Sequence, residues 1–498
     1  MRILSAGATA VRGHRPALPL LLRRSEARPR KAPRPSFWLR PRRLLWEEML
    51  AVLALCFFAV QGAVPGIAPD QALATNLAAA TGLMRIGGMA AQALIYGGIL
   101  LLLYRARHKI RPKLPGLSLV LVFTLWVLAT AIWSLDPVLT LRRGVEFALA
   151  GGFGIYLAVR YSLQKQLRIF WVAILLLALG SLVAVYFFPA MGLDRSAGHL
   201  HDWKGVFTQK NASGRMMVLA MALLLGLRRR FASNRMVFCG AWSASMALFL
   251  LLLYKSGSRS AWLLESVVLA GWLAVWMLRK TAPRFRALLL LIVAASGGVL
   301  GLALYVERVR LLAGLGRGVM LSGRVGIWAA VWSFICQRPW LGWGYAAFWQ
   351  GWTGPSFAVS SMVHFLVFHA HDGYLDLWLQ TGFIGLLLFT LIAVQASVRL
   401  AARAARGRWS GMTWPLSVLM IVALYGVDEN TIMIVHGIFW PLVVMALVLL
   451  EGKRAPRHGL RQRSTSLHVA KGGDRGLLLD RRCYAARALS SRRVAPTQ

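Results

Sequence analysis

Two histidines one residue apart, His369 and His371, are the side chains in this sequence best suited to acid–base chemistry. They lie just before an apolar run that begins near residue 377, so they stand at the edge of an expected membrane span. An imidazole changes charge near neutral pH and can take a proton from an incoming hydroxyl group. We therefore predict that His371 is a general base.

The histidine pair has two other interpretations. A His-x-His pair can hold a metal ion, and His199 and His201 repeat the spacing. Asp or Glu ligands at matching positions are lacking, so we expect no metal and no other cofactor. A structural role, in which the imidazole only satisfies hydrogen bonds, stays open. The four cysteines are scattered, with no CxxC pair, and predict neither a disulfide framework nor a zinc site: Cys56, Cys239, Cys336 and Cys483.

Cations outnumber acids in the segments on the same side of the expected membrane, which calls for an anionic ligand. Guanidinium groups bind phosphate oxygens in pairs and an ammonium adds a point charge, so the set predicts a diphosphate site. For any one cation the alternative is a lipid headgroup or a helix C-terminus. The residues assigned to the anion site are Arg259, Arg324, Lys210 and Asn211, with Arg142 and Arg338 in supporting positions.

Local sequence suggests how some of these groups are presented. Asn211 is a good N-cap residue before an apolar run, and the free amides of a helix start favour an anion, with Lys210 beside it. A capped helix with a snorkelling lysine is the alternative. Arg259 follows a tight turn at Gly257 and has no acid close in sequence, which favours phosphate binding.

Residues 323–338 predict a helix with Arg324 at its start. Apolar residues recur there at helical spacing until Arg338 and Pro339 end the pattern. We expect an amphipathic helix along the membrane surface, with its apolar stripe facing the membrane. Residues 339–345 follow as an aromatic turn broken by glycines, which fits either an interfacial belt or a surface for stacking sugars.

The elements that must position these side chains are membrane helices. Apolar residues make up 58% of the sequence, and runs near the ~18 residues needed to cross a bilayer recur along it. The alternation of a β-barrel is not seen. We predict an all-α polytopic membrane protein with about twelve transmembrane helices. The expected spans begin near residues 47, 86, 117, 144, 169, 212, 236, 260, 287, 377, 413 and 432.

Charge in the connecting segments predicts the orientation. Short basic loops mark the cytoplasmic face, so both termini lie inside and the long segment 306–376 lies outside. The expected division is a basic tail (1–43), transmembrane helices one to nine (44–305), a periplasmic loop with short amphipathic helices and the site residues (306–376), helices ten to twelve (377–451) and a second basic tail (452–498).

The net charge of +41 at first suggests a nucleic-acid binder. Each tail holds 12 Lys and Arg, however, so 24 of the 58 basic residues lie outside the apolar body. The tails lack apolar periodicity, and we expect them to stay disordered against anionic headgroups, with no nucleic-acid partner. The first tail is too long for an ordinary cleaved signal, so the span after it is expected to remain as an anchor.

A series of short motifs between about residues 117 and 450 resembles the bacterial O-antigen ligase and polymerase family. Residues 133–137 and 371–378 are similar to its exopolysaccharide-production branch, the succinoglycan-type polymerases. In the family Asn usually follows the histidine; Asp372 stands here, and an acid can orient the imidazole or raise its basicity. The remaining motifs are Lys210-Asn211, Ser258-Arg259-Ser260, Arg324 followed by Trp328, residues 339–344 and His371-Asp372.

The resemblance implies a metal-independent, GT-C-like glycosyltransferase in the inner membrane of a bacterium. Its donor would be an undecaprenyl-diphosphate-linked oligosaccharide, used on the periplasmic side. By motif correspondence, Arg259 and Arg324 would bind the diphosphate and His371 would be the base. The acceptor hydroxyl would then attack the anomeric carbon opposite the diphosphate, with inversion of configuration.

Three functions remain to be distinguished. A polymerase of glycan repeats is favoured over a ligase that transfers glycan to lipid A core or to protein. A flippase for lipid-linked sugars is the non-enzymatic alternative, but it needs charged groups deep within several spans, whereas the cations here cluster at one face. The expected partners are the lipid-linked donor, a glycan or lipid acceptor, the membrane and a chain-length regulator.

Overall fold

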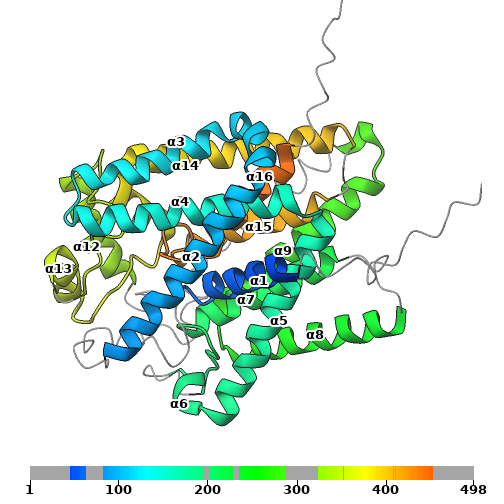
Figure 1. Ribbon diagram of the computed structural model, residues 1–498, viewed down its shortest axis with the longest axis horizontal. Coiled ribbons are helices and arrows are strands. Elements are labelled where there is room, and N and C mark those ends of the chain that lie inside the picture. Colours follow the sequence, from blue (N-terminus) through cyan, green and yellow to red (C-terminus); the bar gives the residue numbers. More distant parts are fainter. Residues whose placement is uncertain are drawn as a thin grey trace, which may run out of the picture. The chain divides into compact units, whose positions relative to one another are not determined.

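The computed structural model describes residues 45–62, 82–194, 201–227, 235–286, 324–351, 353–407, 409 and 411–451 (Figure 1). These ranges are helical, apart from connecting loops and one isolated β-bridge between Leu193 and Trp203. The all-α prediction is therefore confirmed for this part of the chain. Both expected tails, the ninth expected span, His199, Cys483 and the loop up to residue 323 lie outside the described residues.

A helix lies at the position of every expected span that falls within the described residues. Five stretches are long and apolar enough to cross a membrane: Ile86–Ile132, Leu163–Phe187, Arg235–Lys255, Arg259–Lys280 and Gly373–Ala405. The protein is thus a multi-pass membrane protein, and the count of twelve stays a prediction. The helices are α1 (Leu45–Ala59), α2 (Gly82–Ile110), α3 (Ser118–Ala129), α4 (Pro137–Arg160), α5 (Leu163–Phe187), α6 (Pro189–Gly192), α7 (Lys210–Gly226), α8 (Arg235–Lys255), α9 (Arg259–Lys280), α12 (Arg324–Gln337), α13 (Gly354–Val363), α14 (Gly373–Ala405), α15 (Thr413–Tyr425) and α16 (Phe439–Glu451).

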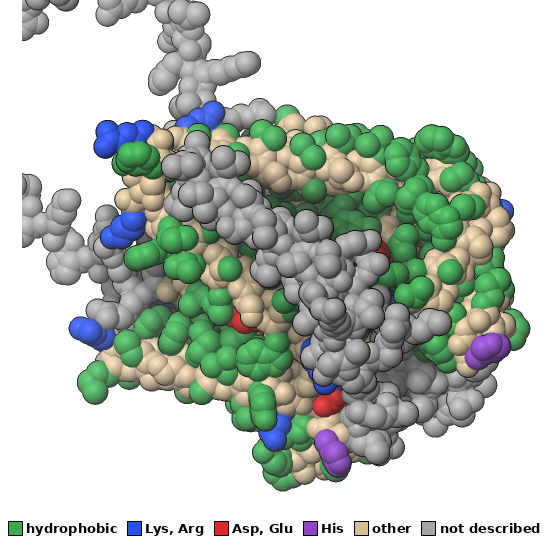
Figure 2. Space-filling model, turned by 180° about the vertical axis from the view of Figure 1, so that it is seen from behind, with side chains coloured by type: hydrophobic (Ala, Val, Ile, Leu, Met, Phe, Trp, Pro, Cys, Tyr) green, Lys and Arg blue, Asp and Glu red, His purple; other side chains and the backbone are tan. Residues whose placement is uncertain are grey.

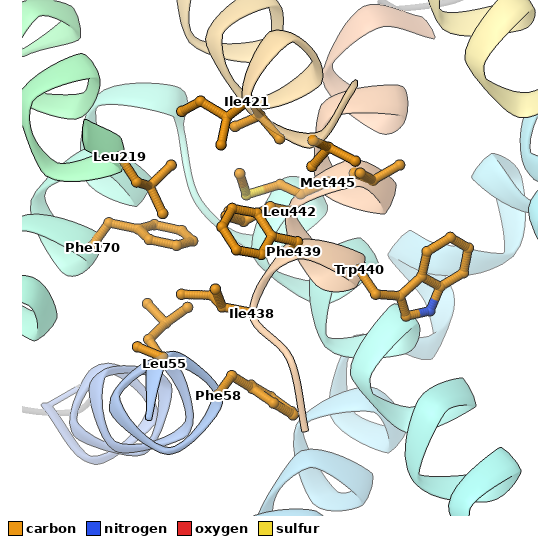
Figure 3. Packing of buried hydrophobic residues seen from close by; sticks show 14 of the residues in the cluster. Leu55, Phe58, Phe170, Leu219, Ile421, Ile438, Phe439, Trp440, Leu442 and Met445 are labelled. Carbon is orange, nitrogen blue, oxygen red and sulfur yellow. The ribbon is translucent and has the colours of Figure 1, made fainter. Parts of the chain in front are cut away.

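Two helices, α7 and α16, form the centre of the bundle. Both are apolar around most of their circumference and are buried along nearly their whole length, as expected for helices surrounded by others. Helix α16 packs on α4 and α15, and α7 packs on α5, α8, α9 and α15. Figure 3 shows side chains of α1, α5, α7 and α15 meeting those of α16: Leu55, Phe58, Phe170, Leu219, Ile421, Phe439 and Leu442.

Outward-facing positions of several long helices are apolar as well. Leu94, Leu125, Leu263 and Val398 are each more than 60% exposed. Figure 2 shows one face of the molecule on which apolar side chains predominate, with most Lys and Arg toward its edges. A surface of this kind suits contact with lipid.

The helix predicted over residues 323–338 is present as α12, but its environment differs from the expectation. Its apolar stripe, which includes Ile327, Val331 and Ile335, packs against α13 and the start of α14 in a second hydrophobic cluster. The prediction that the stripe faces the membrane is therefore wrong. Periodicity identifies the buried face of a helix without identifying what covers it.

Helix α14 begins directly after Asp372 and bends about one third of the way along its length. Asp372 caps it by accepting hydrogen bonds from two amides of its first turn, each at 2.8 Å. At Gly382 the backbone has φ 70° and ψ 178°, and a Cβ there would lie 2.0 Å from the Trp340 carbonyl oxygen. Only glycine fits this close approach between α14 and the aromatic turn.

Candidate active site

His371 lies in the short segment between α13 and α14. Its φ of 48° is uncommon for a residue with a side chain and marks a conformation held by its surroundings. Trp328 of α12 donates from Nε1 to the carbonyl of Ala370 at 3.1 Å, and the Asp372 cap fixes the other end of the segment. The imidazole is held between two helices and is 27% exposed.

The carboxylate that faces His371 is Glu429, in the loop between α15 and α16. Its Oε2 lies 3.3 Å from His371 Nδ1 and 3.9 Å from His369 Nε2, and its side chain is 2% exposed. The backbone amide of His371 donates to His369 Nδ1 at 3.2 Å, so a neutral His369 carries its hydrogen on Nε2. When His371 directs its Nδ1 hydrogen at Glu429, its Nε2 is left as the basic nitrogen.

Arg324, the first residue of α12, binds the same carboxylate. Its Nη2 donates to Glu429 Oε1 at 3.2 Å, and its Nη1 donates to Asp428. A cation at a helix N-terminus opposes the helix dipole, and the two acids compensate for this. The guanidinium is 17% exposed beside the His371–Glu429 pair.

Asn211 connects the starts of α7 and α9 to this site. Its Nδ2 donates to Glu429 Oε1 at 3.0 Å, and its Oδ1 accepts from the Ser258 hydroxyl at 3.0 Å. Ser258 directly precedes Arg259, the exposed first residue of α9. Helix α7 begins at Lys210 with Gln209 as its N-cap, so the expected N-cap role of Asn211 is wrong and its amide bridges two segments instead.

The structure gives the remaining predicted residues other partners. Asp372 caps α14, so the acid next to the imidazole in space is Glu429, 58 positions further along the chain. The others are Lys210, which donates to Asp202 at 2.6 Å; Arg142, which donates to Glu146 at 3.3 Å and Gln92 at 3.2 Å; and Arg338, which donates to the Trp133 carbonyl at 3.3 Å and lies 4.3 Å from the Trp343 ring centroid.

The electrostatics of the site follow from burial and from its close charges. Burial by itself raises the pKa of Glu429, but the hydrogen bond with His371 and the charges of His371, His369 and Arg324 outweigh it and hold the pKa well below its ordinary range. Burial lowers the pKa of His369 to about 3, and His371 acts in the same direction. Near neutral pH the site therefore contains an ionised carboxylate and a neutral His369.

His369, His371 and Glu429 could also hold a metal ion, because one ligand atom from each lies within 4.8 Å of the others. The carboxylate, however, already accepts hydrogen bonds from Arg324 and Asn211 through Oε1. A dication at this point would face the Arg324 guanidinium at short range, which is unfavourable. The hydrogen bonds account for the positions of these side chains without bringing a metal ion close to the Arg324 guanidinium.

Sequence reasoning did not assign Glu429, Asp428, Asn430 or Arg215 to the site. A signal for the two acids was present, because acids are scarce in the segments that carry the predicted cations. For Arg215 the signal was a charge within an apolar run, five residues after Lys210. The pairing of these residues depends on helix packing, which hydropathy does not encode.

Parts of the chain are similar to known proteins. Residues 244–390, which include Arg259, Arg324 and His371, match the family model described as O-Antigen ligase. The chain is 25% identical over 292 residues to the exopolysaccharide production protein ExoQ of Rhizobium meliloti (strain 1021). That alignment covers 56% of this chain and 63% of the relative, so the chain spans less than two thirds of the relative's length.

The fold and the site thus define a multi-pass membrane protein with a histidine–carboxylate pair beside an arginine. Over residues 244–390 the chain is similar to the O-antigen ligase family, and over 292 residues it is similar to an exopolysaccharide production protein.

Proposed function

We propose that this protein is a membrane glycosyltransferase that transfers or polymerises glycan repeats from an undecaprenyl-diphosphate donor on the periplasmic side of the bacterial inner membrane. The observation that carries the proposal is the contact between His371 and the buried Glu429, with Arg324 on the same carboxylate. In the proposal His371 is the base, Glu429 is its orienting acid and Arg324 is a phosphate-binding cation.

In the proposed reaction the acceptor hydroxyl loses its proton to His371 Nε2. The hydroxyl oxygen attacks the anomeric carbon of the donor sugar as the bond to the diphosphate oxygen breaks, which inverts that carbon. Glu429 orients the imidazole and stabilises the imidazolium that forms. Arg324 and Arg259 stabilise the charge that grows on the diphosphate. Because a diphosphate is a good leaving group, the mechanism requires no metal ion.

A polymerase in exopolysaccharide or O-antigen biosynthesis is our first choice, supported by the printed name of the relative, an exopolysaccharide production protein. The acceptor is then a second lipid-linked repeat, and a chain-length regulator is an expected partner. A ligase that uses lipid A core or a protein hydroxyl has the same chemistry. A flippase is less well supported, because it gives no role to the pair of His371 and the buried Glu429.

A deletion strain tests this function. Loss of a polymerase leaves single lipid-linked repeats on the periplasmic side, and wild-type protein restores long polysaccharide whereas His371→Ala does not. The measurement is the sidedness and chain length of lipid-linked glycans. Repeats that accumulate on the cytoplasmic side would indicate a flippase, and restoration of polysaccharide by His371→Ala would reject the proposed base.

A further inference from the structure

Asp376, in the first turn of α14, is a fully buried carboxylate that the proposed reaction does not use. It accepts hydrogen bonds from Trp349 Nε1 at 2.6 Å and from Gln380 Nε2 at 3.0 Å. It also accepts from the side-chain amide of Asn430, and the backbone amide of Ala370 is directed at it. A buried carboxylate with this many donors is well satisfied and therefore holds its donors in defined places.

Two of these groups adjoin the proposed catalytic pair. Ala370 directly precedes His371, and Asn430 directly follows Glu429. Asp376 thus binds the chain next to the base and the chain next to its orienting acid, although the two segments are 58 residues apart. One side chain thus bridges the two segments.

Arg215 of α7 holds Asn430 through its backbone carbonyl. Its Nη1 donates to the Asn430 carbonyl at 3.1 Å, and the guanidinium lies 5.0 Å from the Tyr425 ring centroid and 5.2 Å from that of Phe439. The side chain is 2% exposed, so it is a support rather than a surface cation. Asn430 Oδ1 also accepts from the amide of Met433 at 3.2 Å, so both polar atoms of its side-chain amide are engaged.

We propose that Asp376 is a positioning residue for the transfer reaction: through Ala370 and Asn430, and with Arg215 behind Asn430, it sets His371 against Glu429. The inference rests on the proposed function, because it assigns Asp376 a role through that pair. A displacement of about 1 Å at a reacting group can cost roughly 100-fold in rate, so loss of this support acts mainly on kcat.

The test uses the purified full-length protein and the lipid-linked repeat that accumulates in the deletion strain. Asp376→Asn keeps the size of the side chain but replaces one acceptor oxygen by a donor, which conflicts with the amide of Asn430 or Gln380. We expect kcat to fall roughly 10- to 100-fold while KM for the donor changes less than about 3-fold. The reciprocal double variant Asp376→Asn/Asn430→Asp restores one hydrogen bond with its direction reversed, and we expect it to recover part of the lost kcat.

A double-mutant cycle separates positioning from general destabilisation. In a Glu429→Gln background the pairing of His371 with residue 429 is already impaired, so adding Asp376→Asn should lower kcat little further. The matched control is Ser417→Ala, which removes a buried hydrogen bond donated by Trp272 Nε1 at 2.8 Å elsewhere in the bundle. Its fractional effect on kcat should multiply with that of Glu429→Gln. If Asp376→Asn does not fold, Asn430→Ala takes its place with the same measurements.

An effect of Asp376→Asn on KM alone would overturn the inference. The same fractional loss of kcat with and without Glu429→Gln would overturn it as well. Its failure is distinct from failure of the proposed function. If the function is wrong, His371→Ala stays active; if only the inference is wrong, His371→Ala is inactive while Asp376→Asn behaves like Ser417→Ala.

Discussion

At the scale of single residues, the chemistry proposed for this protein depends on the Glu429 carboxylate, which several polar groups share. His371 Nδ1 lies 3.4 Å from Oε1 and 3.3 Å from Oε2, and Oε1 also accepts from Arg324 and Asn211. The carboxylate therefore links the base to the cation that would hold the leaving group. Its charge offsets both the imidazolium that forms and the guanidinium.

Replacement of Glu429 by glutamine tests this role. The amide keeps the size of the side chain but removes the charge that stabilises the imidazolium, so we expect kcat to fall roughly 10- to 100-fold. The comparison is Glu146→Gln, which removes a carboxylate paired with Arg142 and Arg143 on α4. Equal rates for the two variants in the purified-protein assay would show that Glu429 has no special part in catalysis.

At the scale of elements, the site is made where several helices begin. Arg324 and Arg259 are the first residues of α12 and α9, Asn211 is in the first turn of α7, and the Asp372 cap starts α14. Helix starts present unsatisfied amides and the positive end of the helix dipole, so together they favour an anionic ligand. This agrees with the preference for diphosphate predicted from the cations.

The elements also show what sequence could and could not predict. The apolar runs are local, so helices were expected at the right positions, and α12 was expected with Arg324 at its start. Local patterns could not show that α12 packs on α13 and α14, or that Asn211 reaches Glu429 across 218 positions. The neighbouring acid Asp372 was a natural choice for the imidazole partner, yet it caps a helix.

At the scale of the whole molecule, the buried site makes stability depend on pH. The pKa of His369 is lowered to about 3 by burial, whereas in the unfolded chain its imidazole titrates near its ordinary value of about 6.5. Between these values the unfolded state binds a proton that the folded state does not. The free energy of unfolding therefore falls as pH falls, by at most about 1.4 kcal/mol per pH unit for one proton.

Glu429 acts in the same direction at lower pH. Its pKa is lowered in the folded protein, so its contribution to stability is present above its ordinary pKa and is lost as pH falls toward the folded value. We expect the apparent Tm of the purified protein to fall between pH 7 and pH 4.5, and to fall less steeply in His369→Gln. The exposed His108 supplies the control, His108→Gln; an identical slope in all three proteins would contradict the assignment.

The central claim is that His371 acts as a metal-independent base in glycosyl transfer from a lipid diphosphate. The most direct measurement is glycan transfer by the purified protein, with the lipid-linked repeat from the deletion strain, in excess EDTA. We predict that the wild-type protein stays active with inversion at the anomeric carbon, and that His371→Ala loses roughly 100-fold or more in kcat. Undiminished transfer by His371→Ala, or transfer abolished by EDTA and restored by a divalent metal, would contradict the claim.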